Sequence, residues 1–491
     1  MSALIIVFAA PWIGMLFIAL FARRPNLRES ASLITAVALV FAVFKLLQNS
    51  DALSHHTFTL VKIASGLTLS FRPEPLGLMF CTLASVLWVI NTMYSIAYMR
   101  SNQESHQTRF YLCFAAAIGS TMGLALSSNL FTLFIFYEML TLSTYPLVTH
   151  KGNDEARRGG RTYLGYLLVS SIGFLLFAII WTWNVTGQLE FVLGGIFKAN
   201  TSPVTLSILL VLFMFGIGKA ALMPMHRWLP AAMVAPTPVS ALLHAVAVVK
   251  AGVFTVLKVV LYVFGAKTIH SLPVTSWLIW LAGLSILLAS VFALLQDNLK
   301  KRLAYSTVSQ LSYVTMAALI AHPITLLAAA IHIVVHAFGK ITLFFTAGSI
   351  YTATHKTKVS QLNGVGHALP WTMIAFTIGA LSMIGLPPTG GFISKWYLLV
   401  GSIEAKQWLG NTNMWMVLGV LALSTVLNAS YFLPISYSAF FKSAPDTEPK
   451  YKEASWLMVL ALMVTALGTV ILFFSLGPVI QFLNQLFVSP S

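Results

Sequence analysis

A small set of ionisable side chains lies inside long apolar stretches of this sequence. Charged groups are costly in such surroundings, and in membrane proteins they usually line ion paths or proton relays. One member of the set is a carboxylate and the rest are lysines and histidines. The candidate relay residues are Glu138, Lys219, His244, Lys250, His332, His336, Lys340 and Lys395.

Proton transfer is the chemistry that suits these residue types. A free lysine, with a pKa of about 10.4, holds its proton too tightly to release it at neutral pH. In general, burial weakens that hold and a neighbouring carboxylate restores it. A pair formed by Glu138 and a lysine that can move apart would therefore act as a switch. Histidine titrates near neutrality, which suits it to pass protons between lysines.

Three of the candidates fall on one side of a single predicted helix. His332, His336 and Lys340 are spaced by four residues. Residues four apart in an α-helix are offset by only about 40° around its axis. A purely structural helix would gain nothing from such a polar stripe, so we interpret it as a relay. Two histidines at this spacing can also bind a metal, but no cysteine or nearby carboxylate completes a ligand set. We therefore expect no metal site.

Two apolar stretches, 203–234 and 369–408, are longer than one membrane crossing needs, and both contain prolines. Proline removes a backbone donor and interrupts a helix. At membrane depth a broken helix is tolerated only where it is buried in protein or lines a wet cavity. Broken helices in matching halves of a chain point to a transport site, and ordinary proline kinks are the alternative. The prolines are Pro224 and Pro230 in the first stretch, and Pro387 and Pro388 in the second.

Each predicted break lies close to a lysine. Lys219 precedes the prolines of the first stretch, and Lys395 follows those of the second. His244 and Lys250 are six residues apart and so point to different sides of their helix. A simple hydrogen-bonded core histidine is the alternative for His244. A lysine can also extend along a helix to the membrane surface, which is the alternative for Lys250 and the preferred interpretation for Lys258.

The composition requires membrane-spanning helices to position these residues. Of 491 residues, 58% are hydrophobic and 9% are charged, whereas a soluble domain carries about 25% charged residues. Repeated apolar runs of about 20 residues suffice to cross a bilayer as helices, and a β-barrel would show short alternating segments instead. We predict an all-α integral membrane protein with about fourteen transmembrane helices.

The net charge of +16 does not indicate nucleic-acid binding. The basic residues are scattered between apolar runs, as in membrane proteins whose orientation they set, and no basic motif is present. Cys81 and Cys113 lie in apolar runs without metal-type spacing, so we expect both to be core residues. Arginines follow the apolar run 4–21 rather than precede it, which favours a first helix over a signal peptide.

The lysines and arginines of the loops predict the orientation. They concentrate in the loops after odd-numbered spans, which the positive-inside rule places in the cytoplasm, with both termini outside. We expect the membrane to be a bacterial or archaeal cytoplasmic membrane, and we expect the longest loop, 49–74, to form a small hairpin. The odd loops hold Arg23, Arg24, Arg28, Arg100, Arg109, Lys151, Arg157, Arg158, Arg161, Lys300, Lys301, Arg302, Lys356, Lys358, Lys442, Lys450 and Lys452, and the even loops hold Lys62, Arg72, Lys198, Lys267 and Lys406.

At the candidate residues the sequence resembles a known family. This family comprises the antiporter-like subunits shared by Mrp-type multisubunit Na+/H+ antiporters, energy-converting hydrogenases and respiratory complex I. Four stretches carry the resemblance in the family's order, and the resemblance covers nearly the whole chain. They are FYEMLTLSTYPLV, GKAALMPMHRWLPAAMVAPTPVSALLHA, HIVVHAFGKITLF and GLPPTGGFISKWYLL.

The resemblance implies a fold and a division of the chain. Helices 4–8 and 9–13 would form two inverted five-helix half-channels, with helices 7 and 12 broken. The implied parts are three N-terminal helices in 1–108, the first half-channel in 109–264, the second in 265–438, and helix 14 in 439–491.

The resemblance also implies roles for the candidate residues. Glu138 and Lys219 are similar to the pair of the first half-channel, His244 to its linking residue, and Lys395 to the terminal lysine of the second. The stripe of His332, His336 and Lys340 is similar to the family's central relay. Lys250 stands in HAVAVVKAGVF, which also resembles family members.

The D-type subunit of Mrp antiporters is the most similar type, on the stretch PPTGGFISKWYLL. The largest family members carry a long lateral C-terminal helix, whereas this chain ends soon after the predicted helix 14. One complex I subunit type has glutamate where this chain has Lys395. An N-type complex I subunit or a hydrogenase-type subunit is the second choice.

The resemblance therefore implies a proton-translocating subunit of a Na+ or K+/H+ antiporter. Its expected partners are small membrane subunits and a second, larger antiporter-like subunit. The alternatives are a proton-pumping subunit of a redox complex and a proton-coupled module that energises another protein, such as one for inorganic-carbon uptake. We expect no cofactor and no enzymatic site in this chain. Na+ prefers oxygen ligands and Glu138 is the one deep carboxylate, so a Na+ path is expected to use a partner subunit.

Overall fold

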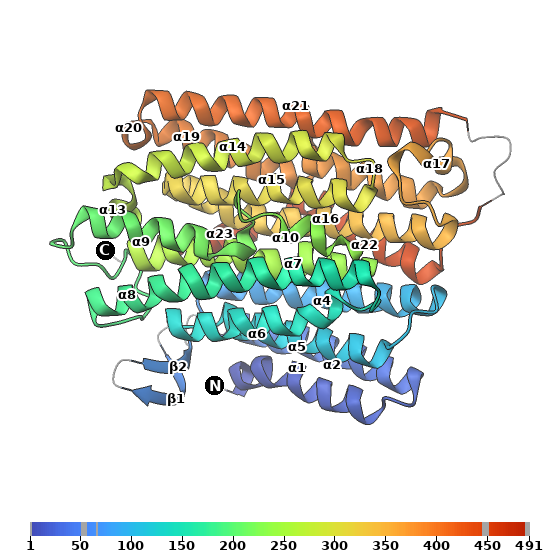
Figure 1. Ribbon diagram of the computed structural model, residues 1–491, viewed down its shortest axis with the longest axis horizontal. Coiled ribbons are helices and arrows are strands. Elements are labelled where there is room, and N and C mark those ends of the chain that lie inside the picture. The colour runs from blue at the N-terminus through green and yellow to red at the C-terminus, as the bar shows by residue number, and fades with distance from the viewer. Residues whose placement is uncertain (1, 51–55, 65–66, 444–450, 487–491) are drawn as a thin grey trace.

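Helices dominate the structure and run side by side across the molecule (Figure 1). The computed structural model describes residues 2–50, 56–64, 67–443 and 451–486. Lys450 and parts of the 49–74 loop lie outside these residues. Within the described residues, eleven helices are long and apolar enough to cross a membrane. The prediction of an all-α membrane protein is confirmed.

The N-terminal part consists of three long helices and a hairpin. Prolines at the first turns of the second and third helices fit the free N–H positions of a helix start. Two strands connect these two helices, as the sequence predicted. The elements are α1 (Ser2–Leu20), α2 (Pro25–Gln48), β1 (Phe58–Ala64), β2 (Leu67–Phe71) and α4 (Pro75–Ser101).

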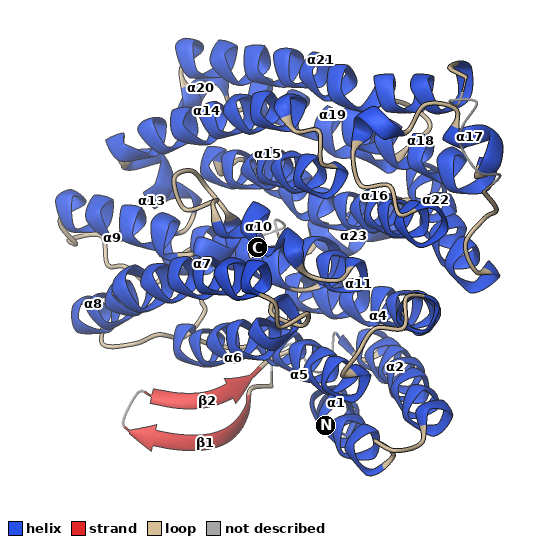
Figure 2. Ribbon diagram, turned by 45° about the vertical axis from the view of Figure 1, so that its right-hand side comes forward, coloured by secondary structure: helices blue, strands red, loops and turns tan. Residues whose placement is uncertain are grey.

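The two strands pair antiparallel, with Phe58 opposite Phe71. They lie at the edge of the helical bundle (Figure 2). The backbone N–H of Ser70 donates to the Thr132 hydroxyl at 3.0 Å, and the Asn129 amide donates to the Ser70 hydroxyl at 2.9 Å. The hairpin is therefore held against the start of the helix that carries Glu138.

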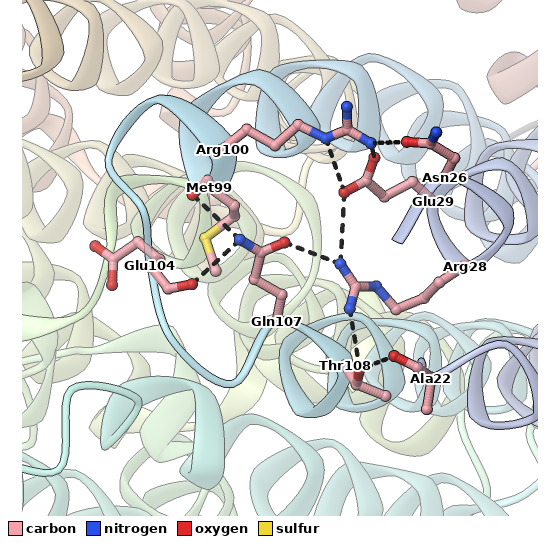
Figure 3. A network of polar contacts seen from close by, with 9 residues as sticks. All are labelled: Ala22, Asn26, Arg28, Glu29, Met99, Arg100, Glu104, Gln107 and Thr108. Atoms are coloured by element: carbon pink, nitrogen blue, oxygen red, sulfur yellow. Dashed lines mark hydrogen bonds and ion pairs between the residues drawn. The ribbon is translucent and has the colours of Figure 1, made fainter. Parts of the chain in front are cut away.

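A buried ionic cluster joins the first helices at their other end (Figure 3). Glu29 forms ion pairs with Arg28 and Arg100. Arg28 also donates to Gln107 at 2.9 Å and to Thr108 at 3.0 Å. Arg28 is only 5% exposed, so its interpretation as a loop residue that sets orientation was incomplete. It ties α2 to the helix that begins at Gln107, and Arg100 ties α4 to α2 through Glu29.

The next part of the chain contains the first broken crossing. The first half of this crossing ends at Gly216, and the backbone is no longer helical at Ile217. The break therefore begins before Pro224 and Pro230, the prolines that predicted it. Lys219 therefore lies within the break and not ahead of it. The elements are α5 (Gln107–Ala125), α6 (Leu130–Val148), α7 (Asp154–Ser170), η1 (Ser171–Leu176), α8 (Phe177–Thr186), α9 (Pro203–Gly216), η2 (Gly218–Ala220), α10 (Trp228–Ala231), η3 (Ala232–Val234), α11 (Thr237–Ala241), η4 (Leu242–Val246), α12 (Val248–Lys258) and η5 (Val259–Phe264).

The last part contains the second broken crossing. One half ends at Ile384 and the other begins at Gly390, so Pro387 and Pro388 lie in the break, as predicted. The elements are α13 (Ala266–Ser271), α14 (Pro273–Leu295), α15 (Leu299–Ile320), α16 (Pro323–Thr354), η6 (Val359–Gln361), α17 (Val365–Ala368), α18 (Pro370–Ile384), α19 (Gly390–Glu404), α20 (Lys406–Leu409), α21 (Asn411–Phe441), α22 (Trp456–Ser475) and α23 (Gly477–Asn484).

Three crossings are shielded from the surroundings by the others. The segment from α11 to η5 is entirely buried over its most apolar window, and α15 and α16 are nearly so, whereas α1 and α22 are mostly exposed. Charged groups in a membrane are tolerated where they face protein or water rather than lipid. The shielded crossings carry most of the candidate relay residues.

Close packing between α12 and the first break depends on a glycine. A Cβ at Gly252 would lie 2.3 Å from the Lys219 carbonyl carbon, a distance at which backbone must move. Glycine alone therefore lets α12 approach the segment that holds Lys219.

We expect Gly252→Ala to destabilise the protein by about 1–3 kcal/mol, because it overpacks a backbone contact. The measurement is the thermal unfolding midpoint in detergent. Gly419→Ala is the matched control, because a Cβ there meets no atom within 4 Å and alanine favours a helix. Equal unfolding midpoints for the two variants would contradict the proposed contact.

Candidate functional site

Lys219 lies in the first broken crossing and is fully buried. Its Nζ donates to the Thr141 hydroxyl at 2.6 Å and to the Tyr137 carbonyl at 2.8 Å. The same Nζ lies 3.2 Å from the centre of the Tyr137 ring. The backbone N–H of Lys219 donates to the Tyr137 hydroxyl at 3.0 Å. Helix α6 therefore holds both the backbone and the amine of this lysine.

Glu138, the predicted partner, neighbours Lys219 without bonding it. The carboxylate acts electrostatically on Lys219, but among the described residues no hydrogen bond reaches its buried Oε1 atom. The amine bonds the neutral groups of Tyr137 and Thr141 instead. The structure thus shows the lysine and the carboxylate as neighbours that are not joined by a hydrogen bond.

His244 and Lys250 face different helices, as their spacing predicted. His244 Nδ1 lies 3.0 Å from the Thr307 hydroxyl on α15. Lys250 Nζ lies 2.5 Å from His336 Nδ1 on α16. Lys250 is 1% exposed, so the alternative of a lysine reaching the membrane surface is wrong for this residue.

The stripe on α16 contacts three neighbouring helices. His332 Nδ1 lies 2.9 Å from the Ser394 hydroxyl of α19. His336 faces Lys250 of α12, and the rings of His332 and His336 are 5.8 Å apart. Lys340 Nζ donates to the Ser306 hydroxyl of α15 at 2.7 Å. The stripe therefore links α12, α15 and α19.

Lys395 closes the second broken crossing. Its Nζ donates to the carbonyls of Met383 and Ile384 at 3.0 and 2.8 Å. These carbonyls end α18 and have no partner within their own helix, and a cation is favoured at that end of a helix. The ammonium also lies 5.1 Å from the centre of the Tyr313 ring.

Uncharged side chains connect Lys340 with Lys395. The Tyr431 hydroxyl donates to the Asn428 amide oxygen and lies 3.0 Å from the Ser306 hydroxyl, which can donate to it. The Asn428 amide reaches the Met383 carbonyl, which also accepts from Lys395. Serine, tyrosine and asparagine are common in membrane helices, so the sequence offered no signal that would single out these three.

Lys258 was wrongly interpreted as a lysine that reaches the membrane surface. It is fully buried and forms an ion pair with Glu74, the residue that precedes α4. Arg72 donates to the other oxygen of Glu74 through Nε and Nη2, at 3.0 and 2.6 Å. Glu74 stands at a predicted loop edge, which is why its burial could not be recognised in the sequence.

The buried groups around α16 form one polar system. His336 lies within electrostatic range of Lys250, Lys340, His332 and His244. Groups that each bear a movable proton, joined by hydroxyl and amide groups, are suited to stepwise proton transfer. The arrangement brings together all predicted residues except Glu138 and Lys219, which form a separate contact beside α12.

A family model described as NADH:quinone oxidoreductase/Mrp antiporter, transmembrane, matches residues 127–422. The NADH-quinone oxidoreductase subunit N of Desulforudis audaxviator is 33% identical over 76% of this chain and 73% of that protein. The A/B subunit of a probable K+/H+ antiporter of Rhizobium meliloti is 31% identical over 82% of this chain and only 40% of that protein.

The fold of this chain is also similar to that of a solved structure. A chain of the Mrp complex from Dietzia sp. DQ12-45-1b superimposes with a TM-score of 0.82 and 25% identity. The superposition covers 99% of this chain and 52% of the other. This chain therefore spans about half the length of that protein.

We expect Lys258→Met to destabilise the protein strongly, because Glu74 would lose its buried ammonium partner. Breaking a buried ion pair costs about 3–5 kcal/mol. The loss here is expected at the lower end, because Arg72 still donates to Glu74 in the variant. The measurement is the unfolding midpoint of the purified protein, with Lys258→Arg as the control that keeps the charge. A midpoint for Lys258→Met equal to that of Lys258→Arg would show that the pair does not stabilise the fold.

Proposed function

Because this chain belongs to the NADH:quinone oxidoreductase/Mrp antiporter family, we propose that it is the proton-translocating subunit of a multisubunit monovalent-cation/proton antiporter. The observation that carries the proposal is the contact of Lys250 with His336, at 2.5 Å, between two residues that are each only 1% exposed. A lysine and a histidine that share a hydrogen bond there have a role in moving protons rather than in holding the fold.

The pair of Glu138 and Lys219 supplies the switch. With the two groups apart, Lys219 bonds only a carbonyl and a hydroxyl, and a buried ammonium without a carboxylate gives up its proton more easily. Movement of Glu138 toward Lys219 would restore the charged form. A conformational change in α6 or in the break would therefore load and unload this lysine.

The central residues carry the proton between the halves. The Lys250 ammonium can donate a proton to His336 Nδ1, and the opposite ring nitrogen of His336, Nε2, can release one toward a neutral Lys340 amine, which lies within electrostatic range. Lys340 then connects, through Ser306, Tyr431 and Asn428, to the carbonyl that binds Lys395. Transfer between Lys250 and His336 moves one proton and needs no cofactor, whereas the Met383 carbonyl positions Lys395 beside Asn428 without itself carrying a proton.

We propose a D-type Mrp subunit in an antiporter for Na+ or K+. A hard cation needs several oxygen ligands, and among the described residues Glu138 is the one carboxylate deep within a crossing that carries the proposed relay, since Glu404 is exposed at the end of α19. The cation path is therefore assigned in part to partner subunits, which are small membrane subunits and a larger antiporter-like one. The similarity to a subunit of a probable K+/H+ antiporter supports this choice.

A proton-pumping subunit of a redox complex is the second candidate. The similarity to an NADH-quinone oxidoreductase subunit N, over most of both chains, favours it. The relay would be the same in both cases, and the driving process would differ. In that case conformational coupling from another subunit would move Glu138.

We expect Lys219→Ala to abolish cation-dependent collapse of a proton gradient in inverted membrane vesicles that contain the complete complex. Removal of the amine interrupts the first half of the relay. The measurement is the fluorescence of a ΔpH probe after addition of Na+ or K+. Lys267→Ala, an exposed lysine on α13, is the control and should behave as the parent.

The same vesicles separate the two candidates. Collapse of the gradient by Na+ or K+ that requires Lys219 supports the antiporter. Acidification driven by a redox substrate, and dependent on Lys219, supports the redox complex instead. Unchanged activity of Lys219→Ala in both assays would contradict the proposed relay.

We expect His336→Gln to stop proton transfer while the protein stays folded. Glutamine can still bond Lys250 but cannot carry a proton at neutral pH. The measurements are ΔpH activity and the amount of assembled complex. Parental activity in a correctly assembled His336→Gln complex would exclude His336 from the path.

A further inference from the structure

A polar cavity of about 220 Å³ lies at the end of the molecule that carries most of the basic loops. It lies between the start of α11, the start of α15 and the end of α16. The α7 region also contributes to it. The ionisable and hydroxyl side chains that line it are Tyr98, Lys151, Glu155, Thr237, Lys300, Tyr351, Lys356 and Thr357. The proposed relay does not use any of these residues.

The chain next to this cavity is unwound. Ala235 lies between η3 and α11, and its carbonyl accepts a hydrogen bond from Lys300 Nζ at 2.5 Å. Lys300 also acts electrostatically on His244, which lies deeper along the same crossing. The cavity therefore borders a segment that leads directly to a relay histidine.

A row of polar groups runs from the cavity toward His244. Thr237 lines the cavity, and Ser240 and His244 follow on the same face of the helix at spacings of three and four residues. Ser240 and His244 are fully buried. Within the part of the chain that the structure describes, neither the Ser240 hydroxyl nor His244 Nε2 has a hydrogen-bond partner.

Such unpaired atoms are informative. A buried polar atom without a partner costs about 1–3 kcal/mol, so few are retained in a packed interior without a reason. Alanine at position 240 would avoid that cost. Two of these atoms lie one turn apart between a polar cavity and a relay residue, so water entering from the cavity would satisfy both.

Glu104 supplies a carboxyl beside this cavity. It lies in the loop between α4 and α5, and its side chain turns away from the Arg28–Glu29–Arg100 cluster (Figure 3). It interacts electrostatically with Lys151, Lys300 and Tyr98, which all line the cavity. Burial raises the pKa of Glu104 even though the two lysines lower it. A carboxyl of this kind can bind protons nearer to neutral pH than a free one.

We propose that this cavity is the proton entrance of the relay, with Glu104 at its mouth and the Thr237–Ser240 row leading to His244. The proposal rests on the proposed function. A proton taken up by the Glu104 carboxylate passes along the row to His244 Nε2. The imidazole then gives up the proton on Nδ1 toward Thr307, so one proton enters for each that leaves and no co-reactant is needed.

The first experiment measures access and does not depend on transport. Thr237→Cys, in the complex with Cys81 and Cys113 replaced by serine, is treated with a membrane-impermeant thiol reagent in vesicles of both orientations. We expect labelling only when the basic-loop face is outside. Val239→Cys, buried two residues further on, is the control and should stay unlabelled.

The second experiment measures transport. We expect Ser240→Ala and Glu104→Gln each to slow proton uptake about tenfold, a barrier increase of about 1.4 kcal/mol. Their unfolding midpoints should equal that of the parent. Two control variants make the same changes away from the cavity, Ser85→Ala on α4 and Glu404→Gln at the exposed end of α19, and both should transport at the parental rate.

The outcomes separate the entrance from the relay. One-sided labelling of Thr237→Cys with slowed transport in both variants supports the entrance. No labelling from the basic-loop face, or parental transport in either Ser240→Ala or Glu104→Gln, overturns it. Unchanged transport in Lys219→Ala would instead overturn the relay, and the labelling result would still decide whether this cavity is an entrance.

Discussion

The structure depends on how a lysine ammonium can be kept inside a membrane protein whose described crossings offer few carboxylates to pair with it. Each buried lysine of the proposed relay is held by neutral oxygens or by histidine instead. Lys219, Lys340 and Lys395 all donate to backbone carbonyls. A carbonyl is a good acceptor that does not neutralise the charge, so the proton remains available for transfer.

Broken helices supply the acceptors that this arrangement needs. The end of α18 leaves carbonyls without partners in their own helix, and Lys395 bonds two of them. In the first break the relationship is reversed, since Lys219 lies in the unwound segment and the intact α6 provides the oxygens. Both solutions require irregular backbone at membrane depth, which only surrounding protein can shield.

The surrounding helices provide that shield. The peripheral α1 and α22 expose large apolar side chains, whereas the crossings with relay residues are enclosed. Glycine at position 252 lets α12 lie against the first break. The two ends of the bundle are fixed by ionic clusters, Glu29 with two arginines at one end and Glu74 with Lys258 and Arg72 at the other. These carboxylates thus lie near the helix ends, and the centre is left rich in lysine and histidine.

The sequence alone determined that the chain crosses a membrane many times as helices, because apolar runs of sufficient length are visible without any knowledge of packing. It also indicated which lysines and histidines lie inside, and that a stripe on one helix joins three of them. The start of the first break, the burial of Lys258 and Arg28, and the links through Ser306, Tyr431 and Asn428 were decided by tertiary structure. These features depend on partners that are distant in the chain, such as Glu74 for Lys258. The residues next to a side chain in the sequence do not show which distant residues will pack against it.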